Sequence, residues 1–385
     1  PSVPGTSSTT SVGIGPYRSA IGTQVVDDKA FDALEATILQ RVRTAGLPGA
    51  SLLVVRDGAT VEEEAWLGYT VDTVVPIASA SKWISGATIL SLVDDGTLAL
   101  DAPISTYVAK AANLRTGAIT LRQLLSFTSG LADESKVPCI ESGAGTLQTC
   151  AQDILTQGLV HPPGEAFRYG SQHLHVAAAL AEIVTGVPFA ELVSRRVLRP
   201  LGMTQTMFVN IEAIRKGEVR AETTHPLPAG GLVSSLTDYA RFLEMLAHDG
   251  IAPDGTRVLT PGAIAAMAQN QTEHVRYAFA SAFRVSTRGV YGLAHWIDWT
   301  YADGRAMVES SDGKFGFRPW IDRANGLFGV YLVNDQGSGY VDGDPDAAAD
   351  DAGKAHTSGE WVFTETARAV GGSLPATHYA HRTTR

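Results

Sequence analysis

A serine and a lysine stand three residues apart, at Ser79 and Lys82, where a strand-like run ending at Ile77 gives way to a helical pattern. If a helix begins at Ser79, this spacing places the hydroxyl and the amine on one face within a turn. The Ser79 Oγ would then face the unpaired backbone N–H groups of that turn. Four residues would thus supply a nucleophile, a base and an anion site. Ser-x-x-Lys also occurs by chance, with Ser79 as a simple helix N-cap, so the rest of the chain decides.

Length and composition indicate a globular protein. The chain has 385 residues, of which 44% are hydrophobic, enough for a large core and two domains. Its net charge is −10, and no block of Lys and Arg with interleaved aromatic residues occurs. We therefore expect no nucleic acid and no anionic membrane as a partner. No apolar run reaches the roughly 20 residues of a transmembrane helix, and the oligomeric state stays open.

The start of the chain and its cysteines indicate export. The chain begins at Pro1, and seven of its first eleven residues are Ser or Thr, so we interpret residues 1–20 as a flexible leader of a secreted or periplasmic protein. Cys139 and Cys150, the only cysteines, lie eleven residues apart in a loop-like stretch. We predict a disulfide between them, with two free thiols as the alternative. No further Cys or well-spaced His completes a ligand set, so we expect no metal site.

Strand patterns occur near both ends of the chain, and helical patterns lie between them. Residues 27–45 and about 360–370 predict helices, residues 50–69 predict a hairpin with its turn at 57–58, and late strands are predicted at 291–297, 306–310, 315–321 and 327–333. This order predicts an α+β fold in which an antiparallel sheet is flanked by terminal helices and carries an inserted all-helical domain. We expect the sheet domain at 21–104 and 286–385, and the helical domain at 105–285.

Beyond Ser79 and Lys82, four connecting stretches carry a family resemblance, namely 121–131, 162–169, 200–203 and 230–235. Together with Ser79 and Lys82, they make the chain resemble the Ser-x-x-Lys serine hydrolases of the class C β-lactamase-like superfamily. This group includes family VIII carboxylesterases, D-alanyl-D-alanine carboxypeptidases and nylon-oligomer amidases. The resemblance runs from about Pro48 to Val333.

The resemblance places two further motifs. The second, Tyr-x-Asn, falls on residues 169–171, where Tyr169 is kept and Ser171 replaces the Asn. The third, Lys/His-Thr-Gly on a strand beside the nucleophile, falls on Ser311, Asp312 and Gly313. A register on residues 314–316 would keep the lysine but break the family's spacing to the residues that follow.

The chemistry of a serine nucleophile requires a base close by. Lys82 can serve only if its surroundings lower the reference pKa of about 10.4, and Tyr169 only if nearby cations favour the phenolate. Placed side by side around Ser79, the two residues meet both conditions. The resemblance implies that they share the proton of Ser79, and which one is the formal base stays open. It also implies an oxyanion site formed by the backbone N–H groups of Ser79 and Lys314.

The departures from the family motifs bear on the substrate. Ser311 and Asp312 offer a hydroxyl and a negative charge where relatives hold a substrate carboxylate, so an anionic substrate should be repelled unless Lys314 offsets Asp312. Ser171 weakens the contact to a β-lactam side-chain amide. We therefore expect a small or oligomeric ester, or a non-peptidoglycan amide, as substrate, and no cofactor. The alternatives are β-lactamase or D-Ala-D-Ala carboxypeptidase activity, or a catalytically silent binding relative.

Other candidate sites are weaker. His173 and His175 are two residues apart and do not face one side of a helix, so we interpret them as surface or packing residues. The Asp-rich stretch from Asp342 resembles the start of a calcium loop, but its twelfth position is Gly353, which favours a solvated loop. A Gly-x-Ser-x-Gly elbow is absent, which argues against an α/β-hydrolase.

Overall fold

The computed structural model describes residues 28–108, 111, 113–132, 137–210, 223, 225–279, 290–335 and 356–371. The leader expected at residues 1–20 and the Asp-rich stretch 342–351 lie outside these ranges. The division of the chain into a sheet domain and a helical domain stays a prediction.

An antiparallel sheet of seven strands takes its strands from both ends of the chain, in the order β2-β1-β12-β11-β10-β9-β8. The strands are β1 (Gly49–Arg56), β2 (Ala59–Leu67), β8 (Val290–Tyr291), β9 (Trp296–Thr300), β10 (Ala306–Ser310), β11 (Arg318–Asp322) and β12 (Leu327–Leu332). The early hairpin joins the late strands where β1 pairs with β12. Asp57 and Gly58, both with positive φ, form the turn between β1 and β2, as the sequence predicts.

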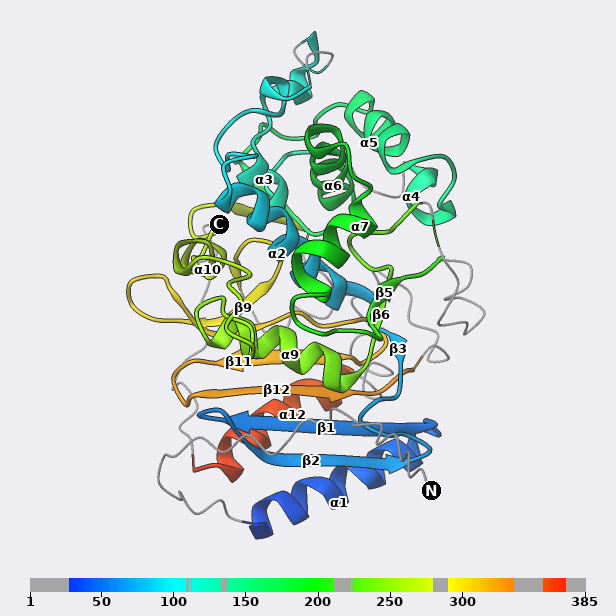
Figure 1. Cartoon of the computed structure of the whole chain (residues 1–385), viewed down its shortest axis with the longest axis vertical. Helices are drawn as coiled ribbons and strands as arrows, with labels where there is room; N and C mark the ends of the chain where they lie inside the picture. The colour runs from blue at the N-terminus through cyan, green and yellow to red at the C-terminus, as the bar shows by residue number, and fades with distance from the viewer. Residues whose placement is uncertain are drawn as a thin grey trace, which may run out of the picture.

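The sheet has helices on both faces. On β1, Leu52 and Val54 face a cluster that includes residues of α1 (Asp28–Thr44) and α12 (His356–Ala369). The alternate residue, Leu53, belongs to the larger core, which contains α9 (Leu236–Ala247). Figure 1 shows the two terminal helices below and behind the strands and α9 in front of β11. This confirms the α+β fold with terminal helices on the sheet.

Most other helices lie above the sheet in Figure 1. They are α2 (Ser81–Asp94), α3 (Leu121–Leu125), α4 (Pro138–Ser142), α5 (Leu147–Thr156), α6 (Gln172–Thr185), α7 (Phe189–Val193) and α10 (Pro261–Met267). Helix α2 is buried from Ser81 to Leu92, as its apolar sequence requires. Among the described residues no single helix is long and apolar enough to cross a membrane, although α6 and the bent continuation 189–198 meet that test as a pair.

Two expectations about local structure are wrong. The run 291–297 is not one strand, because Ala294 has φ 68° and the chain turns between β8 and β9, which pair with each other. The stretch 105–285, which we expect to be all-helical, also contains short strands: β6 (Leu232–Ser234) and β5 (Met207–Phe208) form one small sheet with the earlier β3 (Val75–Pro76), and β4 (Ala166–Arg168) pairs in parallel with β7 (Arg276–Phe279). The pairing of β3 with β6 positions the segment that carries Ser79, which directly follows β3.

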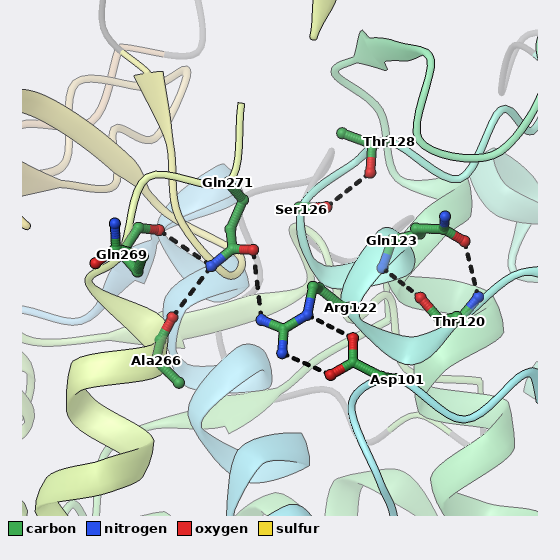
Figure 2. Close-up of polar contacts among 9 residues, drawn as sticks. All are labelled: Asp101, Thr120, Arg122, Gln123, Ser126, Thr128, Ala266, Gln269 and Gln271. Carbon is green, nitrogen blue, oxygen red and sulfur yellow. Dashed lines mark hydrogen bonds and ion pairs between the residues drawn. The ribbon is translucent and has the colours of Figure 1, made fainter. Parts of the chain in front are cut away.

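A polar cluster joins α3 to the segment after α10 (Figure 2). Arg122 donates from Nε and Nη2 to both carboxylate oxygens of Asp101, at 2.6 and 2.8 Å, and from Nη1 to Gln271 Oε1 at 3.4 Å. Thr120 and Gln123 form a capping box at the start of α3. Asp101 is exposed, so the ion pair adds little stability. These contacts link α3 to Asp101 and Gln271, and Phe127 follows two residues after the helix.

Candidate active site

Ser79 lies in a 3₁₀ turn, Ala78–Ala80, and the α-helix α2 begins after it at Ser81. The helix therefore does not begin at Ser79, and the alternative role of Ser79 as a simple N-cap is also wrong, because the N-cap position of α2 falls on Ala80. Ala78 has φ 43°, a left-handed conformation that costs a non-glycine residue about 1–3 kcal/mol. This turn nevertheless keeps Ser79 and Lys82 on one side of the chain.

The side chain of Lys82 reaches Ser79 directly. Its Nζ donates to Ser79 Oγ at 2.8 Å and to the backbone oxygen of Ala229 at 2.7 Å. Lys82 is only 3% exposed. A buried amine in contact with a serine hydroxyl is the arrangement that proton transfer from the hydroxyl requires.

The strand β6 and the start of α9 hold the nucleophile turn from two sides. The N–H of Ile77 donates to Leu232 O at 3.0 Å, and the N–H of Leu232 donates to Ser81 Oγ at 3.1 Å. From α9, the hydroxyl of Tyr239 donates to Ala80 O at 2.8 Å. The strained conformation at Ala78 is therefore fixed by surrounding hydrogen bonds.

Tyr169 lies between β4 and α6, and its ring is close to the amine. Lys82 Nζ is 4.8 Å from the ring centroid. Trp296 stacks on the ring at 5.3 Å, and Phe127 meets it edge-on at 5.5 Å. The structure thus brings together all three residues that the sequence singled out for proton transfer.

His173 supports the backbone next to Tyr169. Its Nε2 lies 2.8 Å from Arg168 O and its Nδ1 lies 2.8 Å from Ser129 Oγ. A carbonyl only accepts, so Nε2 carries the proton and Nδ1 accepts from the serine hydroxyl. Burial lowers the pKa of His173 to about 3, despite the hydrogen bond to Arg168. Of the two roles we expected, packing is correct, since the side chain is fully buried.

The third motif segment packs against the nucleophile turn. Ser311 Oγ donates to Ser79 O at 3.2 Å. A Cβ on Gly313 would lie 2.3 Å from Ile77 O, so only glycine fits there. Lys314 is exposed, with its Nζ 5.3 Å from the centroid of the Phe315 ring. The segment beside the nucleophile is therefore 311–313.

Asp312 is paired by a residue that sequence reasoning missed. Its Oδ1 lies 3.0 Å from Arg318 Nη1, and Arg318 Nη2 lies 3.7 Å from Asp298 Oδ2. The side chains of Asp312 and Arg318 are 12% and 7% exposed, so this is a largely buried pair. From the sequence, Lys314 is the residue expected to offset the charge of Asp312. In the structure Arg318 pairs with this acid.

A buried polar chain lies behind α2. His295 stacks on Trp83 at 4.8 Å, and its Nε2 is 2.9 Å from Glu309 Oε2. Arg323 Nε donates to the other oxygen of Glu309 at 2.6 Å. Burial works to raise the pKa of Glu309, but Arg323 and His295 outweigh it and lower the pKa to about 2. These contacts hold Trp83, the residue after Lys82, in place.

Sequence reasoning also missed a cluster of possible metal ligands beside α6. One ligand atom each of Cys150, His175 and His225 lie within 4.8 Å of one another. Cys150 is bonded to Cys139, which confirms the predicted disulfide. Burial lowers the pKa of His175 to about 3, although its hydrogen bond to Ser171 O opposes this. No sequence motif joins these residues, since they come from three separate stretches.

The chain matches known proteins over most of its length. Residues 32–353 match the family model Beta-lactamase. Penicillin-binding protein 4 of Amycolatopsis lactamdurans is 28% identical over an alignment of 323 residues that covers 75% of this chain and 81% of that protein.

Solved structures share the fold. A protein from Bacteroides dorei, whose assignment as a beta-lactamase is itself provisional, has a TM-score of 0.77 at 28% identity and covers 89% of this chain and 99% of its own. D-amino acid amidase from Ochrobactrum anthropi has a TM-score of 0.66 at 21% identity, covering 89% and 99%, and shows the fold alone. The chain belongs to the Beta-lactamase family of serine hydrolases.

Proposed function

We propose that this protein hydrolyses neutral carboxylic esters of small or oligomeric substrates through an acyl-enzyme on Ser79. The observation that carries the proposal is the 2.8 Å contact between the buried Lys82 Nζ and Ser79 Oγ. A hydroxyl becomes a useful nucleophile when an adjacent base takes its proton. The ring of Tyr169 lies beside the same amine, and in this proposal its hydroxyl shares the proton.

In the proposed reaction, Ser79 Oγ attacks the ester carbonyl while its proton passes to Lys82 or Tyr169. The backbone N–H groups of Ser79 and Lys314 donate to the oxyanion of the tetrahedral intermediate. The proton then moves to the leaving alcohol, and the C–O bond to that alcohol breaks. Water, activated by the same pair, releases the acid and restores Ser79.

The preference for a neutral substrate rests on the third motif. The family's Lys or His is replaced by Ser311, whose Oγ is used in a bond to Ser79 O. The next position carries Asp312, which is paired with Arg318. A substrate carboxylate brought to this position meets an acid and a guanidinium that is already engaged, so electrostatic attraction is small.

A second candidate is hydrolysis of β-lactams or of D-Ala-D-Ala peptides. The observation that favours it is the 28% identity to a penicillin-binding protein. A catalytically silent relative is the third, because both Ser171 and the third motif depart from the family pattern. We also propose an extracytoplasmic location, which the Cys139–Cys150 disulfide supports.

A fluorophosphonate probe and a substrate panel separate these candidates. The wild-type protein should be labelled at Ser79, and Ser79→Ala should not; a folded wild type that resists labelling would favour the silent relative. The panel compares p-nitrophenyl esters, a chromogenic cephalosporin, a D-Ala-D-Ala peptide and an aminohexanoate oligomer. Neutral esters should give the highest kcat/KM, and a cephalosporin that matches or exceeds them would contradict the ester assignment.

A further inference from the structure

Three buried ligand-type side chains outside the group of Ser79, Lys82 and Tyr169 converge where α5, α6 and the segment before Ala229 meet. Cys150 on α5, His175 on α6 and His225 have ligand atoms within 4.8 Å of one another. Cys150 and His175 are fully buried and His225 is 7% exposed. The proposed hydrolase mechanism uses none of the three.

The two histidines are oriented by the protein backbone. His175 Nδ1 lies 3.1 Å from Ser171 O, and His225 Nδ1 lies 3.2 Å from Ala144 O. Because a carbonyl only accepts, each Nδ1 carries the proton and each Nε2 presents a lone pair. Both Nε2 atoms are buried and find no hydrogen-bond partner among the residues that the structure describes.

This arrangement is the one found in metal sites. Histidine ligands bind through one ring nitrogen while the other donates to a carbonyl or carboxylate, which fixes the tautomer. Two buried lone pairs without a donor are costly, and a cation between them removes that cost. A thiolate and two imidazoles suit Zn²⁺, with water in the fourth position.

The disulfide controls the third ligand, since Cys150 Sγ is bonded to Cys139. We propose that Cys150, His175 and His225 form a Zn²⁺ site that becomes available when the Cys139–Cys150 disulfide is reduced. A dithiol reductant supplies two electrons and two protons, gives the two cysteine thiols and itself becomes a disulfide. Zn²⁺ then binds Cys150 as the thiolate, and the thiol proton goes to solvent. A disulfide oxidant that takes back the two electrons, and is itself reduced to two thiols, re-forms the Cys139–Cys150 bond and releases the ion.

The site adjoins the catalytic groups without containing them. His175 is held by the backbone oxygen of Ser171 in the second motif. His225 stands four residues before Ala229, whose oxygen accepts from Lys82. The inference itself does not depend on the hydrolase activity, because metal binding is measured directly.

Co²⁺ serves as the spectroscopic probe for Zn²⁺. Full-length protein, freed of metal, is titrated with Co²⁺ in its oxidised form and, without oxygen, after dithiol reduction and removal of the dithiol. Reduced protein should bind one Co²⁺ per chain with tetrahedral d–d bands and a thiolate-to-cobalt charge-transfer band, and Zn²⁺ should displace it. Oxidised protein should lack the charge-transfer band and bind at least tenfold more weakly. Equal affinity of the two forms would overturn the proposal.

Variants test the ligand set. Cys139→Ser leaves Cys150 as a thiol without any reductant, so this variant should bind Co²⁺ as isolated and show the charge-transfer band. Cys150→Ser should lose that band, and His175→Gln or His225→Gln in reduced protein should weaken binding at least tenfold. His248→Gln, at an exposed histidine, is the matched control. A Cys139→Ser protein that is folded by circular dichroism but shows no charge-transfer band would refute the site, whatever the other variants do.

Discussion

Asp312 Oδ1 lies 3.0 Å from Arg318 Nη1. Asp312 follows shortly after β10, which ends at Ser310, and its segment packs beside the nucleophile turn. The acid and the guanidinium are both largely buried, and Asp298 lies near the same guanidinium. The third motif segment therefore brings a cluster of two acids and one Arg next to the turn that carries Ser79. Which substrate charge is tolerated depends on how this cluster is balanced.

The first prediction is that Asp312→Asn shifts the preference toward anionic substrates. The change leaves Arg318 with Asp298 as its acidic neighbour and makes the cluster one charge more positive. At about 4 Å and an effective dielectric constant near 20, one unit charge is worth about 4 kcal/mol, less with screening. We expect kcat/KM for a cephalosporin to rise at least about tenfold relative to a neutral p-nitrophenyl ester, which corresponds to about 1.4 kcal/mol.

The control for this variant is Asp303→Asn, an exposed acid near β10 that pairs with Arg305. It removes the same charge away from the site and should leave both substrates within about twofold. The gain in Asp312→Asn should shrink at high salt, as an electrostatic effect requires. Equal changes for the ester and the cephalosporin would mean that this cluster does not face the substrate carboxylate.

The site could be predicted from the sequence where its contacts are local. Ser79 and Lys82 are three residues apart, so any helical turn brings them together. The position of Ala229 O, the second acceptor for Lys82, depends on the pairing of β6 with β3. This pairing involves two residues of each strand, which is too short to leave a clear strand pattern in the sequence. Arg318 was missed for the same kind of reason, because its contact with Asp312 depends on how the chain turns between β10 and β11.

In the fold, too, local features are predictable from the sequence and long-range ones are not. Helix α1 and the first hairpin have clear periodicity and a strong turn at residues 57–58, and the structure agrees with both. The run 291–297 is apolar except for His295, so no alternation of apolar and polar residues marks the turn at Ala294. The cluster of Cys150, His175 and His225 left no sequence signal, since tertiary packing alone assembles it.

The second prediction concerns the catalytic residues. Ser79→Ala should abolish hydrolysis, while the free energy of unfolding changes by no more than about 1 kcal/mol, because Lys82 keeps its bond to Ala229 O. Lys82→Ala should lower kcat nearly as much, since members of one catalytic unit are not additive. More than trace turnover in Ser79→Ala, after removal of wild-type contamination, would remove Ser79 from the mechanism.

The third prediction separates the hydroxyl of Tyr169 from its ring. Tyr169→Phe keeps the stack on Trp296, so stability should change little. If the hydroxyl takes part in proton transfer, kcat should fall by about 10²–10⁴-fold with a small change in KM. Tyr107→Phe is the matched control, because that hydroxyl accepts from the Ala99 N–H away from Ser79. Activity of Tyr169→Phe close to wild type would show that Lys82 acts without the phenol.

The fourth prediction is that the disulfide stabilises the oxidised protein. Cys139 and Cys150 are separated by eleven positions in the sequence, and for a loop of this length the chain-entropy model gives about 3 kcal/mol. Urea unfolding of wild type and of Cys139→Ser, both without added metal, measures the difference. Thiol titration of denatured, unreduced wild type should find no free thiol, and finding two would contradict the pairing.

The last prediction is that the protein loses stability below neutral pH because of its buried histidines. The pKa of His173 is lowered from 6.5 to about 3 in the folded protein by burial, against the opposing hydrogen bond to Arg168. In the unfolded chain the imidazole takes up a proton near its ordinary pKa, so between these values the unfolded state binds more protons. The contribution of His173 is therefore complete above pH 6.5 and declines as the pH falls toward 3.

Urea unfolding of wild type and His173→Asn at pH 7.0, 6.0 and 5.0, roughly spanning the ordinary histidine range, measures this effect. Wild type should lose free energy of unfolding faster than the variant as the pH falls, by up to about 1.4 kcal/mol per pH unit for one proton. Glu309 cannot produce this difference, because its folded pKa of about 2 against an ordinary 4.5 places its loss of stability below pH 4.5. Parallel pH profiles for the two proteins would mean that His173 titrates equally in the folded and unfolded states, and its neutral role behind Tyr169 would be wrong.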